Sequence, residues 1–222
     1  MIRAVLFDLD GTLADTAPDL AGALNRMREA RNLEPLPLEL LRIHVSNGAR
    51  GMLGAGFGIK PGDADFIAMR DEFLDRYLAD LKRDSELFSD VPPLLDALED
   101  RGYIWGVVTN KQERYALPLI DLLELTPRAA CVVCGDTTPH AKPHPAPLLE
   151  AAKRIAVDPA HCIYVGDDQR DVVAAHAAGM GSVAAAYGYL GDEIPLDEWG
   201  AHHRIERPLE LLNLLSATPS VR

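Results

Sequence analysis

The strongest constraint on the fold of this chain is a series of short apolar runs with helical patterns between them. A continuous apolar run is typical of a strand in a parallel sheet, because helices cover such a sheet on both faces. Strands are predicted at residues 4–7, 104–108, 130–133, 162–165 and 183–186. Helices are predicted between them at residues 92–100, 113–123, 147–155 and 169–178. This alternation indicates right-handed βαβ units, and therefore an α/β fold with a doubly wound, Rossmann-like parallel sheet.

Residues 16–88 break this alternation, and we find no convincing strand among them. Thr16 is placed to cap a helix, and the apolar residues that follow it share one face of that helix. Those residues are Leu20, Leu24 and Met27. A later run of large apolar residues also has helical spacing: Phe66, Met69, Phe73, Tyr77 and Leu81. We therefore predict a helical cap domain at residues 16–88, inserted after the first strand, and a core domain formed by residues 1–15 and 89–222.

Charge and composition exclude several classes of protein. The 222 residues include 34 Asp and Glu against 22 Lys and Arg, which gives a formal net charge of -12. Such acidity speaks against nucleic acids and anionic membranes as partners, because both are themselves negatively charged. The N-terminal apolar run, residues 4–7, is too short for a signal peptide. Residues 172–191 lack charged side chains but contain four glycines, so we expect a helix, a turn and a strand there and no membrane span.

Cysteine usage favours a reducing compartment. Cys131 and Cys134 form a C-x-x-C pattern, which also occurs in redox pairs. They lie in an apolar run that is typical of a buried strand, and residues three apart on a strand face opposite sides. We therefore interpret them as structural residues and expect a cytoplasmic protein.

Two carboxylates follow the first predicted strand, in the segment Asp8-Leu9-Asp10-Gly11-Thr12. Open α/β sheets bind their ligands at the carboxyl ends of their strands. Carboxylates as close in sequence as those of Asp8 and Asp10 repel each other unless a cation or a proton lies between them. A capping turn is the alternative, since Asp and Gly are common in turns.

A second acidic group follows the fourth predicted strand and contains Asp167, Asp168 and Asp171. Asp168 alone is explained by a helix N-cap, but that explanation does not account for all three residues. Carboxylate oxygens gathered at strand ends suit Mg²⁺, which binds one or two carboxylates together with water and substrate phosphate. We therefore predict a Mg²⁺ site at this edge of the sheet.

Two further motifs carry groups that suit a phosphate. Thr109 and Asn110 end the second predicted strand, where a hydroxyl, an amide and free backbone N–H groups are placed to bind an anion. An ordinary helix cap is the alternative for this motif. Lys142 lies in a proline-rich loop, and a stiffly mounted lysine can offset phosphate charge. A solvated surface lysine is the alternative there.

In this order, the four motifs resemble those of the haloacid dehalogenase-like hydrolase superfamily, and the resemblance covers nearly the whole chain. Residues 16–88 are similar to the helical cap that some of its members insert early in the chain. The motifs match at Asp8 with Asp10, at Thr109, at Lys142, and at Asp167 with Asp168 and Asp171.

This resemblance implies a Mg²⁺ cofactor. The ion would be held by Asp8, by the backbone carbonyl of Asp10 and by Asp167. Asp168 or Asp171 would support these ligands from behind.

The resemblance also implies catalysis through an aspartyl-phosphate. Asp8 would attack phosphorus, and Asp10 would protonate the leaving alcohol and then activate water. Thr109 and Lys142 would stabilise the phosphoryl oxygens.

The resemblance narrows the substrate to a small phosphate ester that carries a carboxylate. The chain is similar to phosphoglycolate phosphatases, and several segments are more similar to N-acetylmuramic acid 6-phosphate phosphatases, which serve peptidoglycan recycling. Those segments are residues 46–50, 70–77, 105–111, 186–189 and 199–201. We favour the muramic acid ester, with phosphoglycolate as the alternative. Arg50 in the cap is expected to bind the carboxylate of either ester, and a surface arginine at a helix start is the alternative.

Other function classes are less well supported. Asp10 separates the chain from the metal-free dehalogenases, which lack this second aspartate. A phosphosugar mutase would share all four motifs, whereas a non-catalytic binding module would tend to lose Asp8 or Asp10. The expected partner is a small phosphate ester, and the protein is expected to be a monomer or a homodimer.

Overall fold

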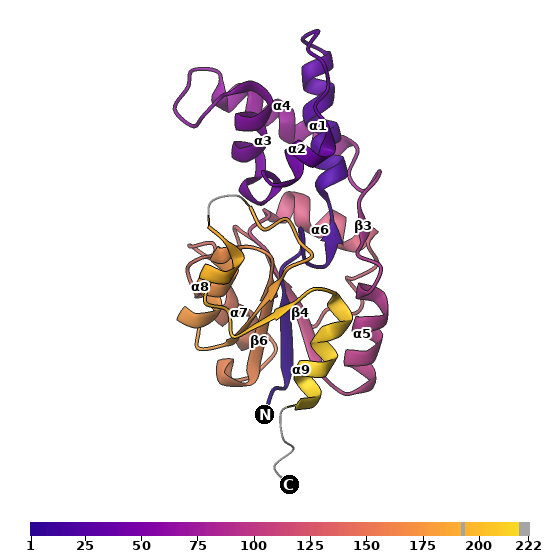
Figure 1. Cartoon of the computed structure of the whole chain (residues 1–222), viewed down its shortest axis with the longest axis vertical. Helices are drawn as coiled ribbons and strands as arrows, with labels where there is room; N and C mark the ends of the chain where they lie inside the picture. The colour runs from indigo at the N-terminus through magenta and orange to yellow at the C-terminus, as the bar shows by residue number, and fades with distance from the viewer. Residues whose placement is uncertain (192–193, 218–222) are drawn as a thin grey trace.

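The computed structural model describes residues 1–191 and 194–217, and a six-stranded sheet forms the centre of that part of the chain (Figure 1). Its strands are β1 (Ala4–Phe7), β4 (Ile104–Val108), β5 (Val132–Val133), β6 (Cys162–Gly166), β7 (Gly181–Ala185) and β8 (His203–Ile205). They lie in the order β5-β4-β1-β6-β7-β8, and every neighbouring pair is parallel. The predicted α/β fold with a parallel sheet is therefore confirmed.

The side chains of the strands enter two hydrophobic clusters, one on each face of the sheet. In β1, Val5 and Phe7 belong to one cluster, and Ala4 and Leu6 belong to the other. The first cluster is covered by α5 (Val91–Asp100), α6 (Glu113–Leu122) and α9 (Leu211–Ala217). The second cluster is covered by α7 (Ala146–Arg154) and α8 (Gln169–Ala177). Because both faces are covered, β1 needs apolar residues at successive positions.

The predicted bounds agree with the observed ones for most of these elements. Strands β1 and β4 have the predicted bounds, and the four predicted helices differ from α5, α6, α7 and α8 by at most one residue at either end. Strand β8 is absent from the prediction. It is an edge strand in which His203 and Arg204 are exposed, so it contains no apolar run.

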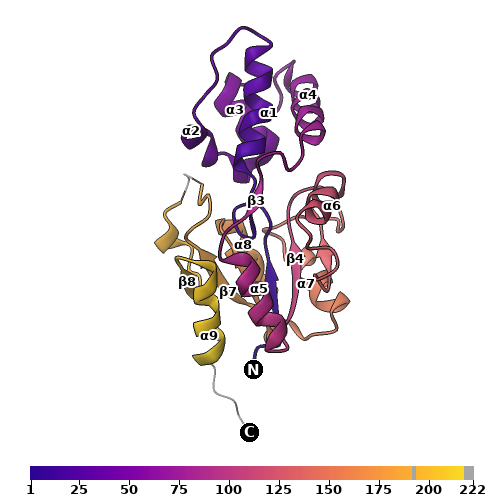
Figure 2. The same cartoon turned by 90° about the vertical axis from the view of Figure 1, so that its right-hand side faces the viewer.

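Four further helices lie above the sheet, at the end of the molecule opposite the N-terminus (Figures 1 and 2). They are α1 (Ala17–Glu29), α2 (Leu38–Arg42), α3 (Gly48–Phe57) and α4 (Phe66–Ala79). They share a third hydrophobic cluster, which includes the predicted apolar face of α1 with Leu20, Leu24 and Met27. This separate cluster supports the predicted division into a cap of residues 16–88 and a core of residues 1–15 and 89–222, and the division stays a prediction.

One expectation for residues 16–88 is wrong, because they contain a strand. Strand β3 (Glu86–Leu87) pairs antiparallel with β2 (Ala14–Asp15). These two strands lie in the segments that connect the large sheet to α1 and α4. A two-residue strand is defined by its partner and has too few positions to show a pattern, so it leaves no signal in the sequence.

Short 3₁₀ helices complete the described chain: η1 (Val45–Asn47), η2 (Pro159–His161), η3 (Leu196–Glu198) and η4 (Pro208–Glu210). Residues 172–191 form most of α8, a turn at Gly179 where φ is 72°, and β7, as expected. Among the described residues, no helix combines the length and the apolar character needed to cross a membrane.

The three cysteines, Cys131, Cys134 and Cys162, are free and buried. Cys131 and Cys134 belong to clusters on opposite faces of the sheet, as predicted for residues three apart on a strand. Burial raises the pKa of all three thiols to about 11. These features support their interpretation as structural residues.

Candidate active site

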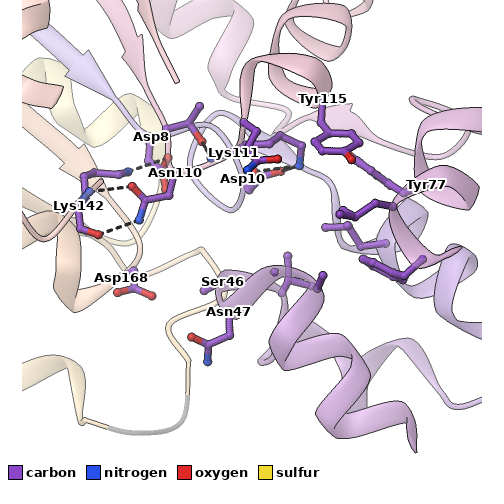
Figure 3. Close-up of a pocket in the computed structure, with 18 of the residues that line it drawn as sticks. Asp8, Asp10, Ser46, Asn47, Tyr77, Asn110, Lys111, Tyr115, Lys142 and Asp168 are labelled. Atoms are coloured by element: carbon purple, nitrogen blue, oxygen red, sulfur yellow. Dashed lines mark hydrogen bonds and ion pairs between the residues drawn. The ribbon is translucent and has the colours of Figure 1, made fainter. Parts of the chain in front are cut away.

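The predicted motifs meet at one edge of the large sheet, below α1–α4. Asp8 follows β1, Thr109 follows β4, and Asp167 follows β6. Because β1 lies between β4 and β6 and all three run parallel, the residues that follow them are neighbours. Lys142, from the segment between β5 and α7, reaches the same place (Figure 3).

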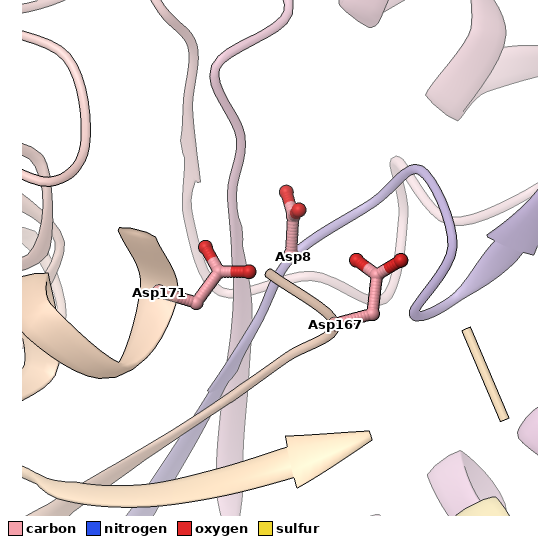
Figure 4. A group of neighbouring side chains, drawn as sticks. All are labelled: Asp8, Asp167 and Asp171. Carbon is pink, nitrogen blue, oxygen red and sulfur yellow. The ribbon is translucent and has the colours of Figure 1, made fainter. Parts of the chain in front are cut away.

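Three carboxylates from two of these motifs come together. Asp8, Asp167 and Asp171 each bring one oxygen within 4.8 Å of the others (Figure 4). Asp167 and Asp171 are buried, with exposed fractions of 1% and 2%. Hard oxygen donors at this spacing suit Mg²⁺. The structure thus brings together three of the residues that the sequence assigns to the Mg²⁺ site.

The backbone around Asp167 has room for glycine alone at two positions. A Cβ atom at Gly11, where φ is 81°, would collide with the Asp167 carboxylate, and a Cβ atom at Gly188 would collide with the Asp167 Cβ. The carboxylate accepts hydrogen bonds from the Tyr189 N–H at 2.7 Å and from the Thr12 hydroxyl at 3.3 Å. These contacts fix its direction.

The electrostatic environment of Asp167 is unfavourable for a carboxylate without a cation. Burial, followed by the charges of Asp8 and Asp171, raises the pKa of Asp167 well above its usual range. Its hydrogen-bond partners, a backbone N–H and a hydroxyl, carry no full charge. A bound divalent cation would supply the missing charge, so these residues fit a metal site.

Lys142 places its ammonium between two of the three carboxylates. Its Nζ lies 2.9 Å from Asp8 Oδ1 and 2.7 Å from Asp171 Oδ1, and its side chain is 2% exposed. It also donates hydrogen bonds to the Tyr164 hydroxyl at 2.6 Å and to the Val108 carbonyl at 3.1 Å. Burial disfavours the charged lysine, but Asp171 and Asp8 outweigh burial and raise the pKa of Lys142. The alternative of a solvated surface lysine is therefore wrong.

Asn110 and Thr109 support this arrangement. The Asn110 side chain donates to the Lys142 carbonyl at 2.9 Å and accepts from the Lys142 N–H at 2.9 Å, so it holds the lysine loop in place (Figure 3). Thr109 is 2% exposed, and its hydroxyl accepts a hydrogen bond from the Lys111 N–H at 3.2 Å. Since α6 begins at Glu113, Thr109 is not its N-cap.

The start of α8 distinguishes Asp168 from Asp171. Asp168 is the N-cap, and its side chain accepts from the Arg170 N–H at 2.8 Å and pairs with the Arg170 guanidinium at 2.6 Å. Asp171 accepts from the Asp168 N–H at 3.1 Å and so completes a capping box. Burial alone would raise the pKa of Asp168, but Arg170 outweighs burial and lowers it, whereas burial raises the pKa of Asp171 to about 7. Asp168 thus pairs with an arginine, and Asp171 joins the three-carboxylate group.

Asp10 pairs with a lysine. Lys111 Nζ lies 2.9 Å from Asp10 Oδ1 and 3.1 Å from Oδ2, and the Thr16 hydroxyl donates to Oδ1 at 2.5 Å. Lys111 Nζ also lies 4.8 Å from the ring centroid of Tyr77 on α4 (Figure 3). Burial disfavours the Lys111 ammonium, but Asp10 and Tyr77 outweigh burial and raise the pKa of Lys111 above its ordinary value. These contacts therefore hold the Asp10 side chain in one orientation.

Thr16 occupies the predicted N-cap position of α1, but its hydroxyl makes no capping hydrogen bond, because it is engaged with Asp10. Tyr189 replaces it. The Tyr189 hydroxyl accepts from the Thr16 N–H at 2.7 Å and from the Ala17 N–H at 3.0 Å at the start of α1, and the Ala17 N–H also reaches Asp15 Oδ1 at 3.4 Å. Tyr189 therefore joins the start of α1 to the acidic group, since its own N–H binds Asp167.

The residues of this site without a predicted role include Thr16 as a partner of Asp10, Lys111 and Tyr189. Lys111 stands beside a predicted motif, which is the one local signal that favours it. Its partner Asp10 lies 101 positions away, and Tyr189 lies 173 positions from Thr16. No local pattern joins residues so far apart, so the tertiary structure is needed to find these pairs.

A cavity of about 560 Å³ separates the acidic group from α1–α4. Asp8, Asp10, Thr109 and Asn110 line it. Its cationic lining residues are Arg70, Lys111, Arg114, Lys142 and Arg170.

Arg50 is absent from the described residues that line this cavity. It is exposed on α3, donates to Asn47 Oδ1 at 3.1 Å, and lines a smaller adjoining pocket of about 140 Å³. The structure therefore places it apart from the other predicted substrate-binding residues.

Comparison with known proteins gives consistent matches along the chain. Residues 5–185 match the family model described as haloacid dehalogenase-like hydrolase. Phosphoglycolate phosphatase of Xanthomonas campestris pv. campestris is 48% identical over 210 residues, which cover 94% of each chain. N-acetylmuramic acid 6-phosphate phosphatase of Pseudomonas aeruginosa is 41% identical over 96% of this chain and 95% of its own. The crystal structure of a predicted phosphoglycolate phosphatase from Haemophilus somnus is similar with a TM-score of 0.84 and 28% identity, covering 96% of this chain and 98% of that one.

Proposed function

Because this chain belongs to the haloacid dehalogenase-like hydrolase family, we propose that it is a Mg²⁺-dependent phosphatase that hydrolyses a small phosphate monoester. The observation that carries this proposal is the group of three carboxylates, Asp8, Asp167 and Asp171, with the Lys142 ammonium between two of them. Asp8, Asp171 and Lys142 line the cavity. The names of the phosphoglycolate and N-acetylmuramic acid 6-phosphate phosphatases support the same reaction.

Asp8, Asp167 and Asp171 are the side chains proposed to hold Mg²⁺, together with the backbone carbonyl of Asp10. When bound, the cation neutralises phosphate oxygens and orients the ester. Asp168 acts behind these ligands, because its backbone N–H holds Asp171 through the capping box.

Asp8 is the proposed nucleophile. Its carboxylate oxygen forms a bond to phosphorus while the bond between phosphorus and the ester oxygen breaks, which leaves an aspartyl-phosphate. Lys142 lies 2.9 Å from Asp8, and Thr109 ends the neighbouring strand, so both are placed to stabilise the phosphoryl oxygens.

Asp10 is the proposed general acid and base. It gives a proton to the leaving ester oxygen and then takes a proton from the water that attacks phosphorus. That attack breaks the bond between phosphorus and the Asp8 oxygen, which releases phosphate and restores the free carboxylate. The contacts of Asp10 with Lys111 and Thr16 hold it in the orientation that both steps need.

The proposed substrate is N-acetylmuramic acid 6-phosphate, and phosphoglycolate is the alternative. Relatives of both names cover nearly the whole chain. The cavity of about 560 Å³ lies in the range of roughly 300–1,000 Å³ that is usual for small-molecule sites. It has room for a phosphorylated sugar as well as for the smaller ester.

We also propose that the protein works in the cytoplasm. Its three cysteines are free and buried. Free thiols are usual in a reducing compartment.

Phosphate release from a panel of esters, with Mg²⁺ and with EDTA, tests the proposed function. The panel contains both named substrates, other sugar phosphates and p-nitrophenyl phosphate. We expect Mg²⁺-dependent release, and we expect Asp8→Asn to lower it by about a thousandfold or more, because the nucleophile is lost. Asp121→Asn is the matched control, because Asp121 is exposed on α6.

The outcomes separate the candidate functions. Undiminished activity in Asp8→Asn would refute the nucleophile assignment. Faster turnover of phosphoglycolate than of the muramic acid ester would favour the alternative substrate. Dependence on a sugar bisphosphate would indicate a phosphosugar mutase, and absence of any Mg²⁺-dependent release would indicate a binding module.

A further inference from the structure

The cationic side chains that line the cavity differ in the carboxylates with which they form ion pairs. Among the described residues, three of the five pair with carboxylates of the catalytic motifs: Lys142 with Asp8 and Asp171, Lys111 with Asp10, and Arg170 with Asp168. The other two, Arg70 and Arg114, pair with acids on the surface of the cap helix α4.

Arg70 and Arg114 differ in exposure. The Arg70 side chain is 39% exposed, and its partner Asp71 is 57% exposed. The Arg114 side chain is 62% exposed, and its partner Asp75 is 69% exposed. Ion pairs this exposed contribute little, so a ligand carboxylate can replace the protein carboxylate at low cost. Arg70 is the more enclosed of the two, and it is therefore better placed to hold a ligand inside the cavity.

Helix α4 places Arg70 at a defined distance from the catalytic end of the cavity. Tyr77 marks that end, because its ring lies 4.8 Å from the Nζ of Lys111, which pairs with Asp10. Arg70 precedes Tyr77 by seven positions on the same helix, so both lie on one face. Seven residues correspond to a rise of about 10 Å along the helix axis.

Apart from Asp71, which pairs with Arg70, the cavity lining between these two residues is apolar. Phe73 and Leu74 stand between Arg70 and Tyr77, and both line the cavity. The wall therefore runs from a polar catalytic end, past apolar side chains, to a guanidinium.

We propose that Arg70 is a specificity-determining residue that binds a substrate carboxylate separated from the phosphate ester by about one sugar ring. A guanidinium suits this task, because its planar fork pairs with both oxygens of a carboxylate. The inference rests on the proposed function, since it requires a phosphoryl group at Asp8. It also selects between the candidate esters. Phosphoglycolate carries its carboxylate on the carbon next to the ester oxygen, whereas N-acetylmuramic acid 6-phosphate carries it across the ring.

Two sugar phosphates that differ in the carboxylate test this role. N-acetylglucosamine 6-phosphate matches N-acetylmuramic acid 6-phosphate except that it lacks the lactyl acid. We expect Arg70→Ala to lower kcat/KM for the muramic acid ester by about 10- to 100-fold, mostly through KM, because a charge-assisted contact is lost. Turnover of N-acetylglucosamine 6-phosphate and of phosphoglycolate should change by no more than about threefold. Arg70→Lys should recover part of the loss.

Matched arginine variants complete the experiment. Arg83→Ala is the control for loss of an arginine from residues 16–88. The Arg83 side chain is 64% exposed, and Arg83 is not among the described residues that line the cavity. An equal loss on both sugar phosphates, or a selective loss in Arg114→Ala or Arg50→Ala but not in Arg70→Ala, would overturn the role of Arg70 and leave the phosphatase intact. A wild-type enzyme that releases no phosphate from any ester would instead refute the proposed function on which this role rests.

Discussion

Lys142 balances the negative charge that the strand ends concentrate. Its ammonium lies between Asp8 and Asp171, at 2.9 and 2.7 Å, and its side chain is 2% exposed. A buried ion pair adds little net stability while it is intact, but removing one partner leaves a buried charge without compensation. In the absence of a metal ion, the Lys142 ammonium therefore offsets the repulsion between the carboxylates of Asp8 and Asp171 in the folded chain.

We expect Lys142→Met to lower the free energy of unfolding by about 3 kcal/mol in EDTA, because the buried Asp171 and the partly exposed Asp8 lose their cation. Mg²⁺ should recover part of this loss, since a cation bound at Asp8 and Asp171 replaces the missing charge. Urea denaturation in EDTA and in Mg²⁺ measures both effects. Lys153→Met is the control, because the Lys153 side chain is 82% exposed. Equal stability of Lys142→Met and the wild type in EDTA would contradict the prediction.

At the scale of elements, helix α1 depends on a residue from the far end of the chain. Its first residues have no side-chain cap of their own, because the Thr16 hydroxyl binds Asp10. The Tyr189 hydroxyl accepts from the Thr16 and Ala17 N–H groups instead, and Tyr189 is 4% exposed within the hydrophobic cluster of α1–α4. One tyrosine thus supplies both the cap and part of the packing.

Tyr189→Phe separates these two contributions. The ring stays in the cluster, but the Thr16 N–H loses its acceptor and the Ala17 N–H keeps only Asp15 Oδ1 at 3.4 Å, so we expect the free energy of unfolding to fall by about 1–2 kcal/mol. Urea denaturation measures the change. Tyr103→Phe is the matched control, because the Tyr103 hydroxyl makes no hydrogen bond within residues 1–191 and 194–217. If both variants unfold at the same urea concentration, the capping role of Tyr189 is wrong.

The elements that can be predicted from the sequence are those whose burial produces a pattern of apolar residues within the element itself. Strand β1 is predicted with its observed bounds because both of its faces are buried, which requires four apolar residues in a row. Strands β3 and β8 cannot be predicted in this way. Strand β3 has two residues, and two of the three residues of β8 are exposed, so each strand is defined by its pairing partner alone.

The same limit divides the residues of the site. Asp8 and Asp167 can be predicted because each directly follows an apolar run, and the parallel sheet brings such positions together. The choice of Arg70 over Arg50 as a lining residue cannot be predicted, because both arginines lie within residues 16–88 and have polar neighbours in sequence. Which one faces the cavity depends on how α3 and α4 pack against α1, and this packing is a tertiary property.

At the scale of the whole molecule, side-chain contacts as well as the chain itself join the large sheet to helices α1–α4 around the cavity. The Arg170 guanidinium donates to the Ser46 carbonyl at 2.6 Å, and Arg114 pairs with Asp75 at 3.2 Å. Each contact joins a residue near the large sheet to one in residues 16–88. The cavity is therefore bounded by polar contacts that can break and re-form, which suits a site that must admit and release a substrate.

Buried ionisable groups throughout the molecule also set its response to alkaline pH. Burial raises the pKa of Cys131, Cys134 and Cys162 to about 11, and burial raises that of Tyr187 as well. In the unfolded chain a thiol ionises near pH 8.5, so at higher pH the unfolded state has released protons that the folded state still binds. The stability from these thiols is fully present below about pH 8.5 and is lost as pH rises toward about 11.

We therefore expect the urea midpoint of unfolding to fall steadily between about pH 8.5 and pH 10.5, with little change from about pH 7 to pH 8. Replacing Cys131, Cys134 and Cys162 with alanine should lower the midpoint at neutral pH, because buried atoms are removed, but should make the alkaline decline shallower. The slope of the midpoint against pH thus isolates ionisation from packing, since only ionisation depends on pH. A wild-type midpoint that stays constant to about pH 10.5, or an equal slope in the triple variant, would show that the buried thiols do not control this response.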